Sequence, residues 1–243
     1  MPQLSVNLDL VAALRELRGL KEPDPAQAAV LAELAQADGI AIQFRRDRRH
    51  IRERDIYLLK GVVKTKLTIE MPPVEDYIKK ALEIKPWLVT FVADHADSST
   101  PVSTIDFDAA PVDFSDVANQ FAGVGVNIAY FVEPEPDAVK GAARSGATAV
   151  LINCHGYTAA RTLEEAQSEL DRIDRAVQAA HKSDLVVNCG RGISYRNMRP
   201  LMELGLIDEF VVGHAICVRA MLVGFERAVR EMMDILTLPI TAQ

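Results

Sequence analysis

Short apolar segments alternate with longer helical segments along the whole 243-residue sequence. Eight of the short segments are rich in β-branched residues and indicate strands, over 4–8, 39–44, 66–70, 87–92, 126–132, 147–153, 185–188 and 207–212. Each is followed by a segment of helical character, over 25–37, 53–64, 74–84, 112–122, 135–145, 162–182, 195–203 and 216–236. Strands separated by helices pair in parallel through right-handed crossovers.

Eight strand–helix units in about 250 residues are typical of a (β/α)₈ TIM barrel. The strand segments are apolar almost throughout, which is expected when both faces of a strand are buried. The alternative is an open, doubly wound sheet, but no GxGxxG motif follows the first strand segment. We therefore expect an α/β protein with a single barrel domain over residues 1–243.

The charge balance restricts the class of partner. The chain has 27 Lys and Arg against 34 Asp and Glu, a net charge of −7, whereas nucleic-acid and anionic-membrane surfaces need a basic patch. No apolar run approaches the roughly 20 residues of a membrane span, and the amino terminus lacks the pattern of a signal peptide. The three cysteines have no CxxC spacing and favour neither disulfides nor a zinc site. We expect a soluble cytoplasmic protein without nucleic-acid or membrane partners.

Polar residues follow the predicted strands, where active sites of barrel enzymes lie. They include carboxylates, amides, arginine and histidine, and such a set is typical of an enzyme. The residues are Asn7, Asp9, Gln43, Arg45, Glu70, Asp94, His95, Glu133, Asn153, His155, Asn188, Arg191 and His214.

The segment 22–55 carries the most specific pattern, with PDP, AA, ADGI, RRDRRHI and RD in this order. Further motifs are VNLD at 6–9, LRELRG at 14–19, EM at 70–71, VNCGRGISYRN at 187–197 and VGHAICVRA at 212–220. With these motifs, the sequence resembles the pyridoxine 5′-phosphate synthase family over essentially its whole length. The fold of that family is a (β/α)₈ barrel, in agreement with the pattern of segments.

The resemblance implies a condensation of 1-deoxyxylulose 5-phosphate with 3-amino-1-hydroxyacetone 1-phosphate. This reaction passes through a Schiff base, loses water and phosphate, and closes a pyridine ring without a metal or an organic cofactor. The implied partners are therefore small phosphorylated substrates. The family also forms homo-octamers, in which a neighbouring subunit contributes to the active site.

Several residues suit the binding of phosphate. Gly213 and His214 precede the last helical segment, and backbone N–H groups at a helix N-terminus bind anions. Gly190 and Gly192 flank Arg191 in the preceding loop and allow a close backbone approach to the same anion, with a role in turn formation alone as the alternative.

Other roles follow from the resemblance. Arg45 and His50 match ligands of a second phosphate, although the charges around them could form a solvated, self-paired loop. Glu70 matches a general acid/base, with a structural ion pair as the alternative role. Asn7, Asp9 and Asn153 are expected to line the substrate site, and Arg18 matches a residue that reaches a neighbouring subunit or is a plain surface arginine.

The departures from the family pattern share one direction. Leu10, Gln43, Asn153 and Arg191 stand where the family has histidine, and Leu151 stands where it has glutamate. Histidine transfers protons near neutral pH, whereas glutamine does not titrate and arginine stays protonated. The anion-binding positions are therefore retained while the proton-transfer positions differ, with Glu70, Gln43 and Arg191 at the expected catalytic centre.

Three hypotheses remain open on the sequence. The chain is an orthodox pyridoxine phosphate synthase, a relative with an altered substrate or reaction that relies on Glu70, or a non-catalytic sensor of a phosphorylated B6-type metabolite. Cys154 and His155 could supply replacement chemistry at the sixth strand.

Overall fold

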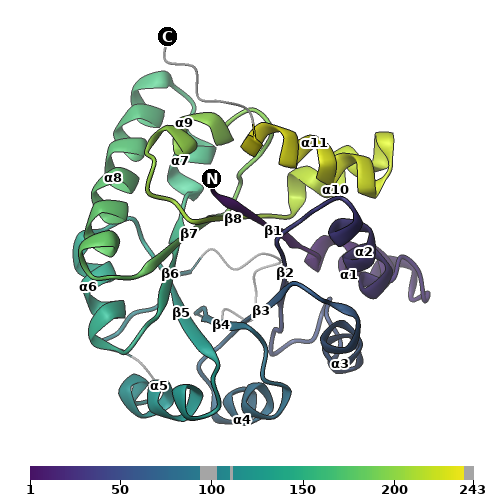
Figure 1. Cartoon of the computed structure of the whole chain (residues 1–243), viewed down its shortest axis with the longest axis horizontal. Coiled ribbons are helices and arrows are strands. Elements are labelled where there is room, and N and C mark those ends of the chain that lie inside the picture. The colour runs from purple at the N-terminus through teal and green to yellow at the C-terminus, as the bar shows by residue number, and fades with distance from the viewer. Residues whose placement is uncertain (94–102, 110–111, 238–243) are drawn as a thin grey trace.

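The computed structural model describes residues 1–93, 103–109 and 112–237. Eight parallel strands close into a barrel in chain order, with β8 paired to β1 (Figure 1). The strands are β1 (Gln3–Asn7), β2 (Gly39–Gln43), β3 (Lys66–Met71), β4 (Leu88–Phe91), β5 (Asn127–Val132), β6 (Ala149–Asn153), β7 (Val186–Gly190) and β8 (Glu209–Val212). The barrel predicted from the alternating segments is confirmed.

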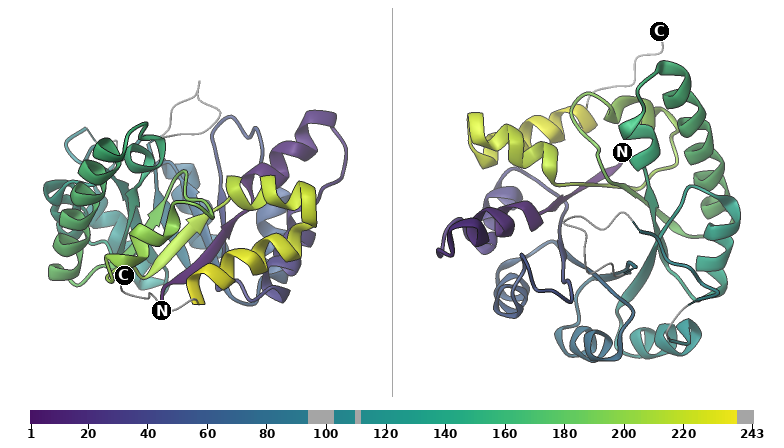
Figure 2. Two further views of the ribbon diagram at one scale, coloured as in Figure 1. Left: turned by 90° about the horizontal axis from the view of Figure 1, so that it is seen from above. Right: turned by 180° about the vertical axis from the view of Figure 1, so that it is seen from behind.

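Helices form an outer layer around the strands, as the two further views in Figure 2 show. Within the described residues they are α1 (Asp9–Arg18), α2 (Pro25–Leu34), α3 (Glu53–Val62), α4 (Glu75–Ile84), α5 (Phe114–Gly123), α6 (Pro136–Arg144), α7 (His155–Ala159), α8 (Leu163–Lys182), α9 (Met198–Glu203), α10 (His214–Val223) and α11 (Phe225–Thr237). Capping residues explain several starts, because Asp24 accepts from the Ala26 N–H and Thr162 accepts from the Glu165 N–H.

The main hydrophobic core lies between the strands and the helices and includes fully buried residues such as Ile40, Ile42 and Phe210. Side chains alternate along each strand, so the other set faces the barrel interior. The interior set is mixed, with an apolar cluster of Val92, Phe131 and Leu151 near the strand ends. Buried polar residues also lie on the strands, namely Ser5, Thr68, Thr90, Asn188 and Glu209.

Three features of the helical layer differ from the prediction, and one of them is the short helix α7, which was not expected. Helix α1 was not expected; it begins only two residues after β1 and ends at Gly19, which has the left-handed φ of 60°. The predicted single helix over 216–236 is in fact two helices, α10 and α11, with Gly224 between them at φ 88°. Both helices contain buried apolar residues, so apolar content alone gave no sign of the break.

Among the helices of the described residues, none is long and apolar enough to cross a membrane.

Candidate active site

A cavity of about 330 Å³ opens where the strands end. Most of the predicted site residues line it: Asn7, Asp9, Gln43, His50, Glu70, Gly190, Arg191, Gly192, Gly213 and His214. Leu10 and Leu151, two of the departures from the family pattern, line the same cavity. The structure therefore brings together residues from β1, β2, β3, β6, β7 and β8.

Three predicted site residues do not line this cavity. Arg45 is buried and its guanidinium forms an ion pair with Asp47 at 2.9 Å. Asn153 is buried at the end of β6, where its amide donates to Glu133 over 3.0 Å. Arg18 is exposed on the last turn of α1.

The other strand-end candidates are dispersed. His155 is exposed at the start of α7, and Cys154 before it is buried. Asn188 lies on β7, buried and below the cavity-lining Gly190. Asp94 and His95 fall outside the described residues.

Glu70 and Arg191 form an ion pair across the cavity. The Arg191 Nη2 donates to the Glu70 Oε2 over 3.0 Å, and the guanidinium also lies 4.9 Å from the centre of the Phe131 ring. Glu70 is only 2% exposed, and this burial raises the pKa of its carboxyl, while Arg191 opposes the rise. The ion pair that the sequence suggested as the alternative role of Glu70 is therefore present. It favours the ionised form of a carboxyl that is buried in the cavity.

A second carboxylate is held at the end of β1. The Asp9 carboxylate accepts from the Gln43 backbone N–H at 2.7 Å and from the Asn7 amide at 2.8 Å. Burial raises the pKa of the Asp9 carboxyl, although both hydrogen bonds favour the ionised form. These contacts join the ends of β1 and β2, and they fix the backbone from which the Gln43 side chain enters the site.

The start of α10 and three glycines bound the cavity at β7 and β8. The first N–H groups of α10 have no intrahelical partner, as at any helix start, and Gly213 precedes them. A Cβ at Gly213 would lie 3.0 Å from the Asn7 carbonyl oxygen, so only glycine fits this approach easily. In the neighbouring loop Gly192 has a φ of +74°, and a Cβ there would collide with Thr158.

Another part of the cavity wall is apolar. Leu10, Leu151, Ile193 and Val211 all line the cavity, and Leu151 packs with Phe131 inside the barrel. The polar pattern of the sequence gave no sign of Ile193 or Val211. Only their positions could have indicated them, because Val211 lies on β8 and Ile193 follows β7.

The described residues contain no group of three or more His, Cys, Asp or Glu side chains that could hold a metal ion.

The model of the family described as "Pyridoxal phosphate biosynthesis protein PdxJ" matches residues 4–238. The chain is 40% identical to the pyridoxine 5′-phosphate synthase of Geobacter metallireducens over 236 residues, which are 97% of this chain and 99% of that protein. It is 41% identical to the synthase of a Synechococcus strain over 232 residues, covering 96% and 97% of the two chains.

Solved structures show the same fold at low identity. A structure described as KGPDC from Streptococcus mutans has a TM-score of 0.64 at 13% identity, with 96% of each chain covered. The N-acetylmannosamine-6-phosphate 2-epimerase of Clostridium perfringens has a TM-score of 0.58 at 13% identity, covering 96% of this chain and 93% of the other. These matches concern the fold alone. The match of the family model over residues 4–238, together with the full-length relatives at about 40% identity, shows that this chain belongs to the PdxJ family of pyridoxal phosphate biosynthesis proteins.

Proposed function

We propose that this protein is a condensing enzyme of the pyridoxine 5′-phosphate synthase type, acting on small phosphorylated amine and ketone substrates with an altered proton-transfer set. The observation that carries the proposal is the buried Glu70 carboxylate, which faces the same cavity as the start of α10. A proton-transfer group and an anion-binding helix end are what the condensation of phosphorylated substrates requires.

Each part of the cavity has a role in this reaction. The N–H groups at the start of α10 bind a substrate phosphate, with Gly213 allowing its close approach. The substrate amine adds to the ketone carbon and water leaves to give the Schiff base; Glu70 then moves protons as phosphate and further water leave and the ring closes. Arg191 stabilises negative charge that develops on substrate oxygen, and the Gln43 amide orients the substrate by hydrogen bonding without titrating.

The non-catalytic sensor is the second candidate. It is favoured by Leu10 and Leu151, which line the cavity with apolar side chains where the family has histidine and glutamate, both of which can transfer protons. The two candidates differ in product formation, since a sensor binds a phosphorylated B6-type metabolite and converts no substrate.

We also propose a cytoplasmic location. The three cysteines are all free and buried, and thiols persist in a reducing compartment.

Replacing Glu70→Gln is expected to lower turnover about 10²–10⁴-fold, the usual contribution of a positioned acid/base group. Glutamine keeps the shape of the side chain, so phosphate affinity measured by calorimetry should stay within about twofold of the wild type. Turnover is followed as pyridoxine 5′-phosphate formed from the two family substrates in a single-turnover assay. Glu164→Gln, on an exposed carboxylate of α8 outside the cavity, is the control. Unchanged turnover in Glu70→Gln would refute its role, and no product from the wild type would exclude the orthodox reaction.

Replacing Arg191→Gln should move the acid limb of the kcat/KM profile to higher pH. Glu70 must be ionised to accept a proton, and Arg191 opposes the rise in its pKa that burial causes. Without the guanidinium the pKa of Glu70 rises further, so a higher pH is needed to ionise it. Arg196→Gln, an exposed arginine in the same loop, should leave the limb in place. An unmoved limb in Arg191→Gln would show that another group governs it.

Replacing Gly213→Ala should weaken the binding of inorganic phosphate by at least about tenfold, because the added Cβ meets the backbone of Asn7 at the start of α10. Isothermal titration calorimetry measures the change. Gly61→Ala is the matched control, since a Cβ there has nothing within 4 Å and the position lies within α3. Equal affinity in the wild type and Gly213→Ala would place the phosphate elsewhere.

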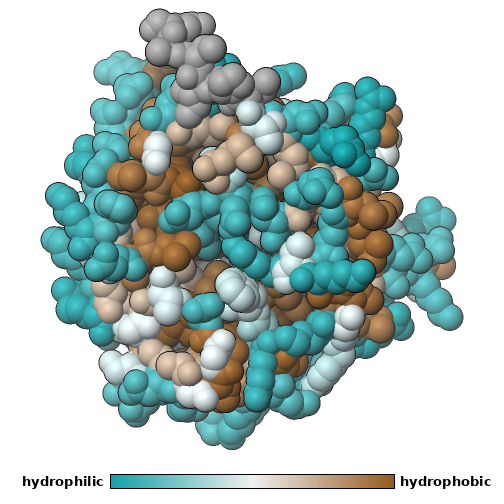
Figure 3. All heavy atoms as spheres, in the orientation of Figure 1, coloured by the Kyte–Doolittle hydropathy of each residue, from teal (hydrophilic) through white to brown (hydrophobic). Residues whose placement is uncertain are grey.

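Assembly into a homo-oligomer, an octamer by the resemblance, is part of the proposal. Helix α1 projects from the body of the barrel in Figure 2, and hydrophobic side chains gather beside its projecting end in Figure 3. Leu17 is 78% exposed on α1 and Leu222 is 79% exposed on α10, a helix that contacts α1. Exposed apolar residues of this size on adjacent helices are typical of an interface. Arg18 on the same projecting turn could then reach a neighbouring site.

The double replacement Leu17→Glu with Leu222→Glu should dissociate the oligomer, because buried carboxylates in an apolar interface are strongly unfavourable. Light scattering coupled to size-exclusion chromatography gives the molar mass. Leu163→Glu, at a position 91% exposed on α8, should leave the mass unchanged. A wild-type protein that elutes as a monomer would contradict the assembly.

A further inference from the structure

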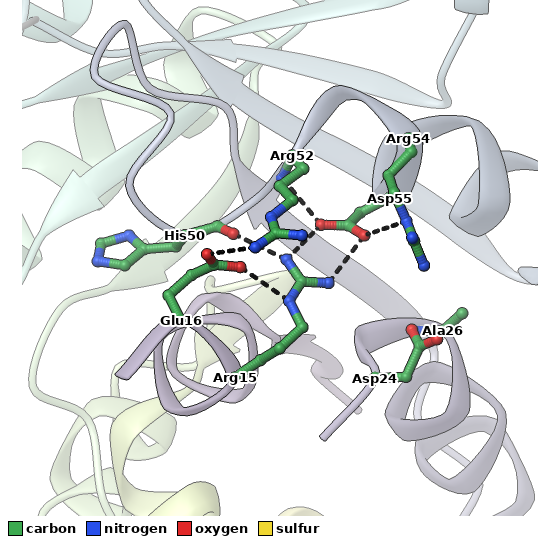
Figure 4. Close-up of polar contacts among 8 residues, drawn as sticks. All are labelled: Arg15, Glu16, Asp24, Ala26, His50, Arg52, Arg54 and Asp55. Atoms are coloured by element: carbon green, nitrogen blue, oxygen red, sulfur yellow. Dashed lines mark hydrogen bonds and ion pairs between the residues drawn. The ribbon is translucent and has the colours of Figure 1, made fainter. Parts of the chain in front are cut away.

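A buried ion-pair network lies behind the cavity, between α1 and the start of α3 (Figure 4). The Arg15 guanidinium binds both Asp55 carboxylate oxygens, at 2.9 and 2.7 Å, and both side chains are at most 2% exposed. The Arg15 Nε also donates to Glu16 over 2.9 Å, and Glu16 accepts from Arg52 over 2.7 Å. The network thus joins α1 and α3, which are separated in the sequence by α2.

Arg15 makes one contact that the pairing of two helices does not need. Its Nη2 donates to the backbone carbonyl oxygen of His50 over 3.0 Å, and the imidazole of the same His50 lines the cavity. Figure 4 shows the guanidinium on one side of this residue and the imidazole pointing away on the other. The contact therefore fixes the backbone of a site residue from behind.

The loop between β2 and α3 is anchored to α1 at both ends. At the first end, Asp9 at the start of α1 accepts from the Gln43 N–H. At the second end, Arg15 in the same helix holds the His50 carbonyl and Asp55, whose carboxylate also accepts from the Arg52 N–H at the start of α3. One helix thus holds both ends of the loop, while the Tyr77 hydroxyl on α4 donates to the Arg45 carbonyl between them.

We propose that Arg15 and Asp55 are positioning residues, which hold the His50 imidazole in the cavity so that it can bind a phosphate of the substrate. The planar guanidinium suits this task because it forms two bonds to the carboxylate and keeps a further N–H for the carbonyl. The inference rests on the proposed function in one respect, the binding of an anion by His50. The position of the imidazole itself is independent of that function.

The titration of His50 reports its position. Burial lowers the pKa of this imidazole, and the charged groups that act on it are Asp9, Arg45, Asp47 and Arg49. Neither Arg15 nor Asp55 is among them, so a change in the pKa of His50 after replacing the pair reports a movement of the imidazole or of the loop charges around it. Release into solvent would raise that pKa toward the ordinary histidine value.

The first test uses Arg15→Lys, which keeps the charge but cannot form the fork and reach the His50 carbonyl together. We expect the pKa of His50, measured by NMR of the ring, to rise, and the Kd for inorganic phosphate to increase about tenfold. Arg172→Lys is the matched control, because Arg172 on α8 forms ion pairs with Glu169 of the same helix and with Glu135 at the start of α6, away from the cavity. It should change neither quantity.

The second test separates positioning from stability. Arg15→Met combined with Asp55→Asn removes both charges together, which leaves no unpaired buried charge, and asparagine keeps an acceptor for the Arg52 N–H. If this variant has the thermal midpoint of the wild type and still shows the raised pKa and the weaker phosphate binding, positioning is supported. Wild-type values of both in this folded variant would overturn the proposal. A pKa shift with no phosphate binding in any variant, wild type included, would refute the proposed function but keep the positioning role.

Discussion

Closure of the barrel by the pairing of β1 with β8 is the constraint on which the site depends. Val6 lies beside Val212 in this pairing, so residues from the two ends of the sequence become neighbours. Asn7 and Gly213 follow directly and meet at the cavity, where the Asn7 carbonyl limits what can stand at position 213. An open sheet of the same strands would leave the start of α10 on one side and the β1 carboxylate on the other.

The fold was predictable because its main signal is local. Buried parallel strands are apolar on both faces, and each strand–helix unit can be recognised within about 30 consecutive residues. The break at Gly224 was missed because α10 and α11 both bury apolar residues, and a single glycine can also stand inside a continuous helix. Helix α1 was missed because it follows β1 almost without a loop.

The site was predictable where residues lie directly at strand ends, as Asn7, Glu70 and Arg191 do. It was not predictable where a nearby carboxylate decides the direction of a side chain. Arg45 follows β2 but turns to Asp47, and Asn153 turns to Glu133. The roles of Arg15 and Asp55 gave no sign in the sequence because their partners are 35 to 40 positions apart. The catalytic roles themselves remain predictions.

Arg191 adopts a φ of +77°, a conformation that costs every side chain with a Cβ roughly 1–2 kcal/mol relative to a right-handed one. The cost comes from the backbone and is nearly the same for arginine, lysine, glutamine or histidine. Exchanges among these residues at position 191 therefore compare side-chain chemistry alone, with the loop energy cancelled. The strained residue of the β7 loop is therefore a suitable place to ask which functional group the reaction needs.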